Sequence, residues 1–244
     1  MKKPKMIIFD YGHTLLYEPD FDFLRGEKEV YQYIIKNPKQ FSVEEINQFS
    51  TELFRKSDVC REQGFELHEW QMLRLQYEYL GIELGISYSE AEKVLWNHIS
   101  KGACMPFVEE LLDCLKENGI RSAVISNIGW SGDALTERIN RLLPDNQFEC
   151  VIASSEYGIR KPNPMIFELA LQKANLQPRD VWYCGDNIKA DVYGARNVGI
   201  FPVFYEEETI ENPCSVQNEG LEIDFEHLHI HSWREMINIL DKLI

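Results

Sequence analysis

The stretch that decides the fold is MIIFDYGHTLL, residues 6–16, in which a short apolar run leads directly into Asp10. Met6–Phe9 is continuously apolar, whereas a strand with one solvent-exposed face alternates apolar and polar residues. Continuous apolarity is typical of a strand that is covered on both faces, as in a parallel sheet between helices. Later runs of the same character are Ser122–Ile125, Cys150–Ala153, Val181–Cys184 and Phe201–Tyr205.

Segments with helical periodicity separate these later runs. Pro106–Asn118 carries Leu111 and Leu115 on one stripe and is followed by Gly119, a typical helix stop. Asp133–Leu143 and Pro164–Ala174 are predicted as two further helices. Repeated alternation of strand and helix predicts an α/β fold with a doubly wound parallel sheet.

The segment from about Glu18 to Lys101 breaks this alternation and contains no convincing strand. The pairs Ser42 with Glu45 and Ser89 with Glu92 have the S-x-x-E spacing of helix-capping boxes. Residues 67–84 are predicted as one amphipathic helix that is dense in aromatic residues. We therefore expect a core domain from residues 1–17 and 101–244, and an inserted helical domain from residues 18–100.

Composition narrows the classes of function. The chain has 244 residues, of which 44% are hydrophobic, so it is long and apolar enough for a packed core. Its 25 basic and 40 acidic residues give a net charge of −15, which argues against nucleic acid or a membrane as partner. A small anionic substrate stays open, because a few local cations can hold one. The six cysteines form no C-x-x-C pair, and no apolar run suits a signal peptide or membrane helix, so we expect a cytoplasmic protein.

Polar residues follow the predicted strands at the sheet edge where ligands bind in such folds. They are Asp10 after the first strand, Ser126 and Asn127 after the second, Lys161 in the loop after the third, and Asp186 and Asp191 after the fourth. Each one alone is also what a turn or a helix cap carries. Together the carboxylates need a hard cation, and oxygen ligands suit Mg²⁺. An ionised carboxylate can attack phosphorus, while Ser126 and Lys161 can hold a phosphoryl group.

These points resemble, in order, the motifs of the haloacid dehalogenase-like (HAD) superfamily. The first motif is matched by Asp10-Tyr11-Gly12-His13-Thr14, the second by Ser126, the third by Lys161 and the fourth by Gly185, Asp186 and Asp191. The resemblance implies a Rossmann-like core, with the insertion in the position of the family's helical C1 cap. It implies that Asp10 is a nucleophile that becomes an aspartyl-phosphate. It also implies that Asp10, the backbone carbonyl of Gly12 and Asp186 bind Mg²⁺, with Asp191 as ligand or support, and that Ser126, Asn127 and Lys161 bind the substrate.

One position departs from that pattern. The family's phosphatases have a second Asp two residues after the nucleophile, as acid for the leaving group and base for water, and here Gly12 stands in its place. The loss puts efficient turnover in doubt, since such a group contributes about 10²–10⁴-fold. His13 could substitute for it, although neighbouring side chains in an extended loop point to opposite sides, which favours a histidine turned away. Glycine at residue 12 is also expected to loosen the loop by permitting positive φ.

Three functions stay open. The first is a Mg²⁺-dependent phosphatase of a small phosphorylated metabolite, with low turnover or a substitute acid. The second is hydrolysis of a carbon–phosphorus or carbon–halogen bond, although Asp186 and Asp191 keep a metal motif that haloacid dehalogenases do not need. The third is a ligand-binding homologue without catalysis. A separate feature, the alternating His227, His229 and His231, is predicted to share one strand face and not to bind a metal, because no cysteine or helical ligand spacing accompanies it.

Overall fold

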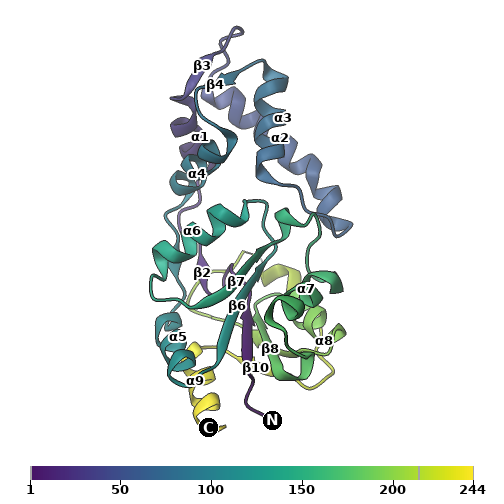
Figure 1. Ribbon diagram of the computed structural model, residues 1–244. Helices are drawn as coiled ribbons and strands as arrows, with labels where there is room; N and C mark the ends of the chain where they lie inside the picture. The colour runs from purple at the N-terminus through teal and green to yellow at the C-terminus, as the bar shows by residue number, and fades with distance from the viewer. Residues whose placement is uncertain (1, 214, 244) are drawn as a thin grey trace.

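A six-stranded parallel sheet forms the centre of the molecule, in the strand order β10–β9–β8–β1–β6–β7 (Figure 1). The computed structural model describes residues 2–213 and 215–243. The strands of the sheet are β1 Met6–Phe9, β6 Arg121–Ser126, β7 Phe148–Ala153, β8 Val181–Gly185, β9 Phe201–Tyr205 and β10 Leu228–Ile230. The flanking helices are α5 Val108–Glu117, α6 Gly132–Leu142, α7 Pro164–Ala174, α8 Gly194–Asn197 and α9 Trp233–Asp241, with a π-helical turn at Ile188–Tyr193.

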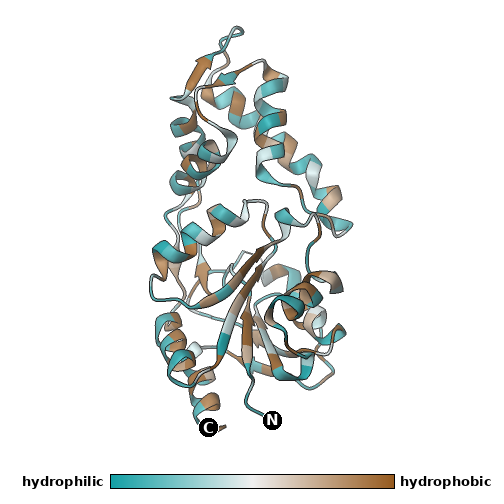
Figure 2. Cartoon of the chain, in the orientation of Figure 1, coloured by the Kyte–Doolittle hydropathy of each residue, from teal (hydrophilic) through white to brown (hydrophobic). Residues whose placement is uncertain are grey.

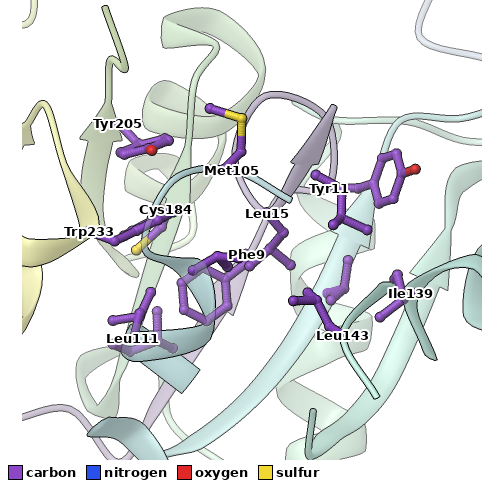
Figure 3. Close-up of a cluster of buried hydrophobic side chains, with 14 of the residues drawn as sticks. Phe9, Tyr11, Leu15, Met105, Leu111, Ile139, Leu143, Cys184, Tyr205 and Trp233 are labelled. Atoms are coloured by element: carbon purple, nitrogen blue, oxygen red, sulfur yellow. The ribbon is translucent and has the colours of Figure 1, made fainter. Parts of the chain in front are cut away.

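Strand β1 shows why this sequence makes a two-sided sheet. All four of its side chains are fully buried. Ile7 and Phe9 pack into one hydrophobic cluster, while Met6 and Ile8 pack into a second cluster on the opposite face. Figure 3 shows the first cluster, and Figure 2 shows helices in which hydrophilic and hydrophobic residues alternate along the ribbon. The α/β doubly wound fold predicted from the continuous apolar runs is confirmed.

Four helices form the insertion, which lies beyond one end of the sheet (Figure 1). They are α1 Phe23–Tyr31, α2 Val43–Glu62, α3 Glu69–Leu80 and α4 Tyr88–Ile99. Two expectations for this region were wrong. The insertion contains a short antiparallel pair, β3 Ile34–Lys36 with β4 Glu83–Leu84. The helix predicted over residues 67–84 spans only Glu69–Leu80, because Gly81, with a φ of 73°, takes the chain out of the helix.

One of the two predicted capping boxes is present, and the other is formed by a different pair of residues. The box of Ser42 with Glu45 is present at the start of α2, as expected. Helix α4 is capped instead by Ser87 with Glu90, not by Ser89 with Glu92. The Glu92 side chain does not cap the helix. It is fully buried and contacts residues that lie far from it in the sequence.

The chain enters and leaves the insertion at adjacent points. Strand β2, Leu16–Tyr17, pairs antiparallel with β5, Ala103–Cys104. The buried Arg138 of α6 bonds both segments that connect the insertion to the core. Its guanidinium donates to Glu18 Oε2 at 2.7 Å and to the carbonyl of Ser100. It also lies 4.4 Å from the ring centre of Trp96 in α4. The insertion is therefore attached through a double-stranded neck.

The C-terminal helix supports the loop that follows β1. Trp233 of α9 donates its indole N–H to the carbonyl of Thr14 at 3.0 Å, stacks on Tyr205 at 4.1 Å and meets the edge of Phe9 (Figure 3). This loop carries the residues that follow Asp10. Within the described ranges, no helix is both long enough and apolar enough to cross a bilayer.

Candidate active site

Asp10 lies where the order of the sheet reverses. From β1 the chain passes to β6 and β7 on one side, and then to β8, β9 and β10 on the other. In open α/β sheets the crevice at such a reversal, beyond the carboxyl ends of the strands, is the usual ligand site. The backbone N–H of Asp10 donates to the carbonyl of Cys184 at 2.8 Å, which extends the β1–β8 ladder and fixes the aspartate at the crevice.

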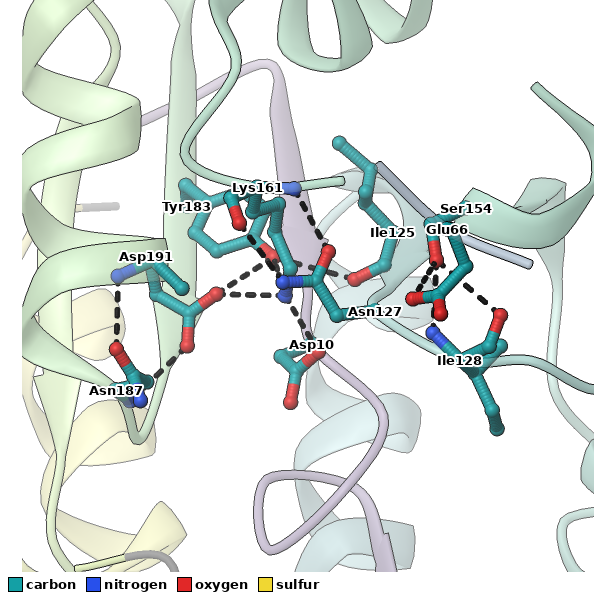
Figure 4. A network of polar contacts seen from close by, with 11 residues as sticks. Asp10, Glu66, Ile125, Asn127, Ile128, Ser154, Lys161, Tyr183, Asn187 and Asp191 are labelled. Carbon is teal, nitrogen blue, oxygen red and sulfur yellow. Dashed lines mark hydrogen bonds and ion pairs between the residues drawn. The ribbon is translucent and has the colours of Figure 1, made fainter. Parts of the chain in front are cut away.

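Lys161 is the cation of this crevice (Figure 4). Its ammonium group is buried and donates to Asp10 Oδ1 at 2.5 Å, to Asp191 Oδ1 at 2.6 Å and to the Tyr183 hydroxyl at 2.8 Å. Burial lowers the pKa of Lys161, but the two carboxylates outweigh burial and raise it above its ordinary value. The lysine therefore stays charged and links residues that lie far apart in sequence.

Asn127 orients this lysine through the backbone. Its side-chain amide donates to the carbonyl of Lys161 at 2.9 Å, and its side-chain oxygen accepts from the backbone N–H of Lys161 at 2.7 Å. Both ends of the Asn127 amide thus bond the backbone of Lys161, and the binding of substrate by Asn127 stays a prediction. Ser126 is buried at the end of β6, beside Asn127.

A group of three carboxylates offers a metal site. Asp10, Asp186 and Asp191 each place an oxygen within 4.8 Å of the others. Burial, offset in part by Lys161, raises the pKa of Asp10 to about 6. Burial, with Asp10 and Asp191 nearby, raises the pKa of Asp186 to about 8. Such a cluster carries more negative charge than one lysine balances, and its oxygen-only donor set fits a hard divalent cation.

Asp191 is held on both of its oxygens. Oδ1 accepts from Lys161 and from the Tyr183 hydroxyl at 3.1 Å, and Oδ2 accepts from the backbone N–H of Asn187 at 3.0 Å. These bonds favour support of the lysine over direct metal ligation. They also explain Gly185, because a Cβ at that position would lie 2.3 Å from the Asp191 carboxyl carbon.

Two asparagines that the sequence analysis missed hold Asp186. Asn212 donates to Asp186 Oδ2 at 2.6 Å, and Asn218 donates to the backbone carbonyl of Asp186 at 2.8 Å. Both belong to the segment that follows β9. The rule applied to the first four strands, that polar residues after a strand face the crevice, would have found this segment if it had been applied to the fifth.

The loop after Asp10 differs from expectation at two positions. Gly12 is not among the residues with positive φ, whereas His13 has a φ of 50°. The histidine, not the glycine, therefore takes the left-handed conformation, and extended-strand alternation does not apply to it. His13 lines a small hollow with Asp186 and Asn212, whereas we expected it to be turned away. Its Nδ1 is buried without a hydrogen-bond partner among the described residues, and burial lowers the pKa of the imidazole.

The insertion touches the loop that follows Ser126. Glu92 of α4 accepts hydrogen bonds from the backbone N–H and the hydroxyl of Ser131, both at 2.6 Å, and from the Trp70 indole at 2.7 Å. Beside it Trp96 stacks on Trp130, with ring centres 5.0 Å apart. A buried carboxylate and a stacked aromatic pair therefore join the insertion to the core.

A second contact joins the insertion to the loop that precedes Lys161. Phe65 forms a β-bridge with Ile159, and the backbone N–H of Glu66 donates to the carbonyl of Gly158 at 3.1 Å. The Glu66 carboxylate also accepts from the Ser154 hydroxyl at 3.0 Å (Figure 4). The insertion thus contacts both loops that position the lysine.

Comparisons with known proteins agree with this arrangement. A family model described as haloacid dehalogenase-like hydrolase matches residues 7–204. Glyceraldehyde 3-phosphate phosphatase of Pyrococcus furiosus is 32% identical over 137 residues, which are 53% of this chain and 55% of that protein. The chain thus spans about half the length of the first curated relatives that it matches.

Two further comparisons cover nearly the whole chain. Pyrimidine 5'-nucleotidase PynA of Streptococcus pneumoniae is 23% identical, with 98% of this chain and 96% of that protein aligned. The crystal structure of a HAD phosphatase from Thermococcus onnurineus has a TM-score of 0.64 at 20% identity and covers 98% of both chains. At that identity the structural likeness establishes the fold alone.

Proposed function

Because the chain belongs to the haloacid dehalogenase-like hydrolase family, we propose that it is a Mg²⁺-dependent phosphatase of small phosphorylated molecules, with Asp10 as nucleophile. The observation that carries the proposal is the buried contact of 2.5 Å between Asp10 and Lys161, with the carboxylates of Asp186 and Asp191 alongside. A carboxylate nucleophile, a fixed cation and a cation-binding carboxylate cluster support phosphoryl transfer, since it depends on positioning and charge stabilisation. The relatives named as phosphatases support the same assignment.

Metal binding and nucleophilic attack are the two roles of these carboxylates in the reaction. Asp10, the backbone carbonyl of Gly12 and Asp186 would hold Mg²⁺, with Asp191 as support. The bound cation would offset the charge of the phosphoryl oxygens. An oxygen of Asp10 forms a bond to phosphorus while the bond from phosphorus to the leaving-group oxygen breaks. Water then attacks the phosphorus, which releases inorganic phosphate and regenerates Asp10.

Lys161 stabilises charge on both partners of this step. Its ammonium group contacts the nucleophile directly, so it can also follow the transferring phosphoryl group. Asn127, Asp191 and Tyr183 position it through the bonds described above. We propose that Ser126, at the neighbouring strand end, donates to a phosphoryl oxygen, and that the insertion acts as a cap that excludes water.

Gly12 leaves two proton transfers without a catalytic group. It brings no carboxyl group to protonate the leaving group or to deprotonate water. His13 supports only part of this role, because its lowered pKa leaves the imidazole neutral at pH 7, able to accept a proton from water but not to donate one. We therefore expect aryl phosphates, whose leaving groups depart as stable anions, to react much faster than alkyl phosphates.

The test is hydrolysis of an aryl phosphate by the purified protein, with and without Mg²⁺, beside Asp10→Asn. Turnover that requires Mg²⁺ and disappears in the variant supports the proposal. His13→Ala in the same assay tests the histidine: unchanged turnover excludes it as the base. Equal background from the wild type and Asp10→Asn on a panel of phosphate esters would instead favour a ligand-binding homologue without catalysis.

A further inference from the structure

A second group of metal-ligating side chains lies on the edge of the sheet, outside the candidate active site. Strand β10 pairs in parallel with β9, so that His229 lies opposite Phe204. Side chains two residues apart in a strand share a face. His229 and His231 therefore project from the same face as Glu206, which lies two residues after Phe204.

The distances within this group suit a single ion. His229 Nε2 lies 2.9 Å from Glu206 Oε2, and the rings of His229 and His231 are 4.5 Å apart. One ligand atom from each of the three residues lies within 4.8 Å of the others. Donors around tetrahedral Zn²⁺, bound at about 2.0–2.1 Å, are roughly 3.3 Å from one another, so small side-chain rotations suffice. Glu208 Oε1 lies 3.6 Å from His231 Nδ1, beside this group but not part of it.

We propose that His229, His231 and Glu206 form a binding site for a divalent transition-metal ion of the Zn²⁺ class. Two imidazole nitrogens with a carboxylate suit Zn²⁺, Cu²⁺ or Ni²⁺, whereas Mg²⁺ takes oxygen ligands. In the described ranges the chain carries two groups able to hold a metal, and they differ in chemistry: the cluster at Asp10 is all oxygen, and this one is mainly nitrogen.

The surroundings support such a site. The side chains of His229, His231 and Glu206 are 40%, 43% and 47% exposed, so an ion reaches them from solvent without opening the fold. The ring of Phe204 lies 4.7 Å from that of His229 and backs it on the sheet side. The net charge of −15 also favours cations near the surface. The spacing of the histidines alone does not reveal this group, because the third ligand, Glu206, directly follows the neighbouring strand β9.

The site borders the candidate active site. Glu206 also lines the hollow that contains His13 and Asp186. The proposal nevertheless stands apart from the phosphatase assignment, because its readout is binding of the ion and not turnover.

The test is calorimetric titration of the full chain with Zn²⁺ in excess Mg²⁺, together with electron paramagnetic resonance of bound Cu²⁺. We expect saturable binding that His229→Gln, His231→Gln or Glu206→Gln each weakens about tenfold or more. The Cu²⁺ spectrum should show hyperfine coupling to imidazole nitrogen that His229→Gln and His231→Gln each reduce and His13→Ala leaves unchanged, which separates this group from the hollow beside Asp186. His227→Gln is the matched control, because its Nδ1 is 2.8 Å from the Phe225 carbonyl and it lies outside the group.

Several results would overturn the proposal. They are Zn²⁺ binding of equal affinity in His229→Gln, His231→Gln and the wild type, an equal loss in His227→Gln, or a Cu²⁺ spectrum without nitrogen coupling. The His227 side chain is half-buried, and unchanged circular dichroism spectra would verify that each variant is folded.

Discussion

Replacing Gly12 with Asp should raise the rate of the phosphatase reaction proposed above. The position lies two residues after the nucleophile, where a carboxyl group could protonate the leaving group and then activate water. Gly12 is not among the positive-φ residues, and a Cβ added there meets no described atom within 4 Å. The backbone and its surroundings therefore accept a side chain's Cβ at this position without a steric cost.

The size of the gain follows from the role that the new group takes. General acid–base catalysis contributes about 10²–10⁴-fold, which is roughly 3–5 kcal/mol of barrier at 1.36 kcal/mol per decade. The nearby carboxylates raise the pKa of an added carboxyl group, which favours the protonated form that an acid requires. We expect the gain to be largest for alkyl phosphates, because aryl leaving groups need little protonation.

The assay is kcat for an alkyl and an aryl phosphate with Mg²⁺ in Gly12→Asp, Gly12→Asn and Gly12→Ala. Asparagine has the shape of aspartate without the proton, and alanine tests the added Cβ alone. The reasoning is refuted if Gly12→Asp is folded but no faster than Gly12→Asn on the alkyl ester.

Three further predictions concern stability and can be measured by urea unfolding. Lys161→Met should cost about 3–5 kcal/mol, because it leaves buried carboxylates without their cation; a loss below 1 kcal/mol would contradict the buried pairing. Burial, with Glu92 and Glu27 nearby, raises the pKa of Glu69 from 4.5 to about 8, so the folded chain keeps a proton that the unfolded chain releases, and stability should fall as pH rises through that range. Glu69→Gln should flatten this slope, and an unchanged slope would count against the shift. Glu92→Ala should cost about 2–3 kcal/mol, because the Ser131 and Trp70 donors lose their acceptor; Glu90→Ala, at an exposed cap, is the milder comparison.

The core of the fold could be predicted from sequence because it depends on local pattern. The apolar runs at Met6–Phe9 and Phe201–Tyr205 coincide with β1 and β9, and Pro164–Ala174 coincides with α7. The short strands β3 and β4 could not be predicted, because their pairing joins residues that lie far apart in the chain.

The capping of α4 shows where local pattern fails. Ser87 with Glu90 and Ser89 with Glu92 have the same spacing two residues apart, so sequence alone does not distinguish them. The partners Trp70 and Ser131, on distant segments, account for the burial of Glu92 and leave Glu90 to cap the helix.

Some residues of the candidate site could be predicted from local sequence pattern, and others could not. The strand-end rule correctly placed Asp10, Lys161 and Asp186 close together, since each follows a recognisable strand. It missed Tyr183, whose position inside β8 looks like core, and Asn212, which reaches back from beyond β9. It also misjudged His13, whose orientation depends on one backbone angle that no spacing reveals.

The most direct test of the central claim is to trap the covalent intermediate. The protein is mixed with an aryl phosphate and Mg²⁺, quenched in acid and digested, and the peptide that contains Asp10 is examined by mass spectrometry. Since Gly12 leaves hydrolysis of the intermediate without its usual base, we predict that this peptide carries a phosphoryl group that is absent in Asp10→Asn. Turnover that requires Mg²⁺ without any phosphoryl group on Asp10, in samples quenched during the reaction, would contradict the account.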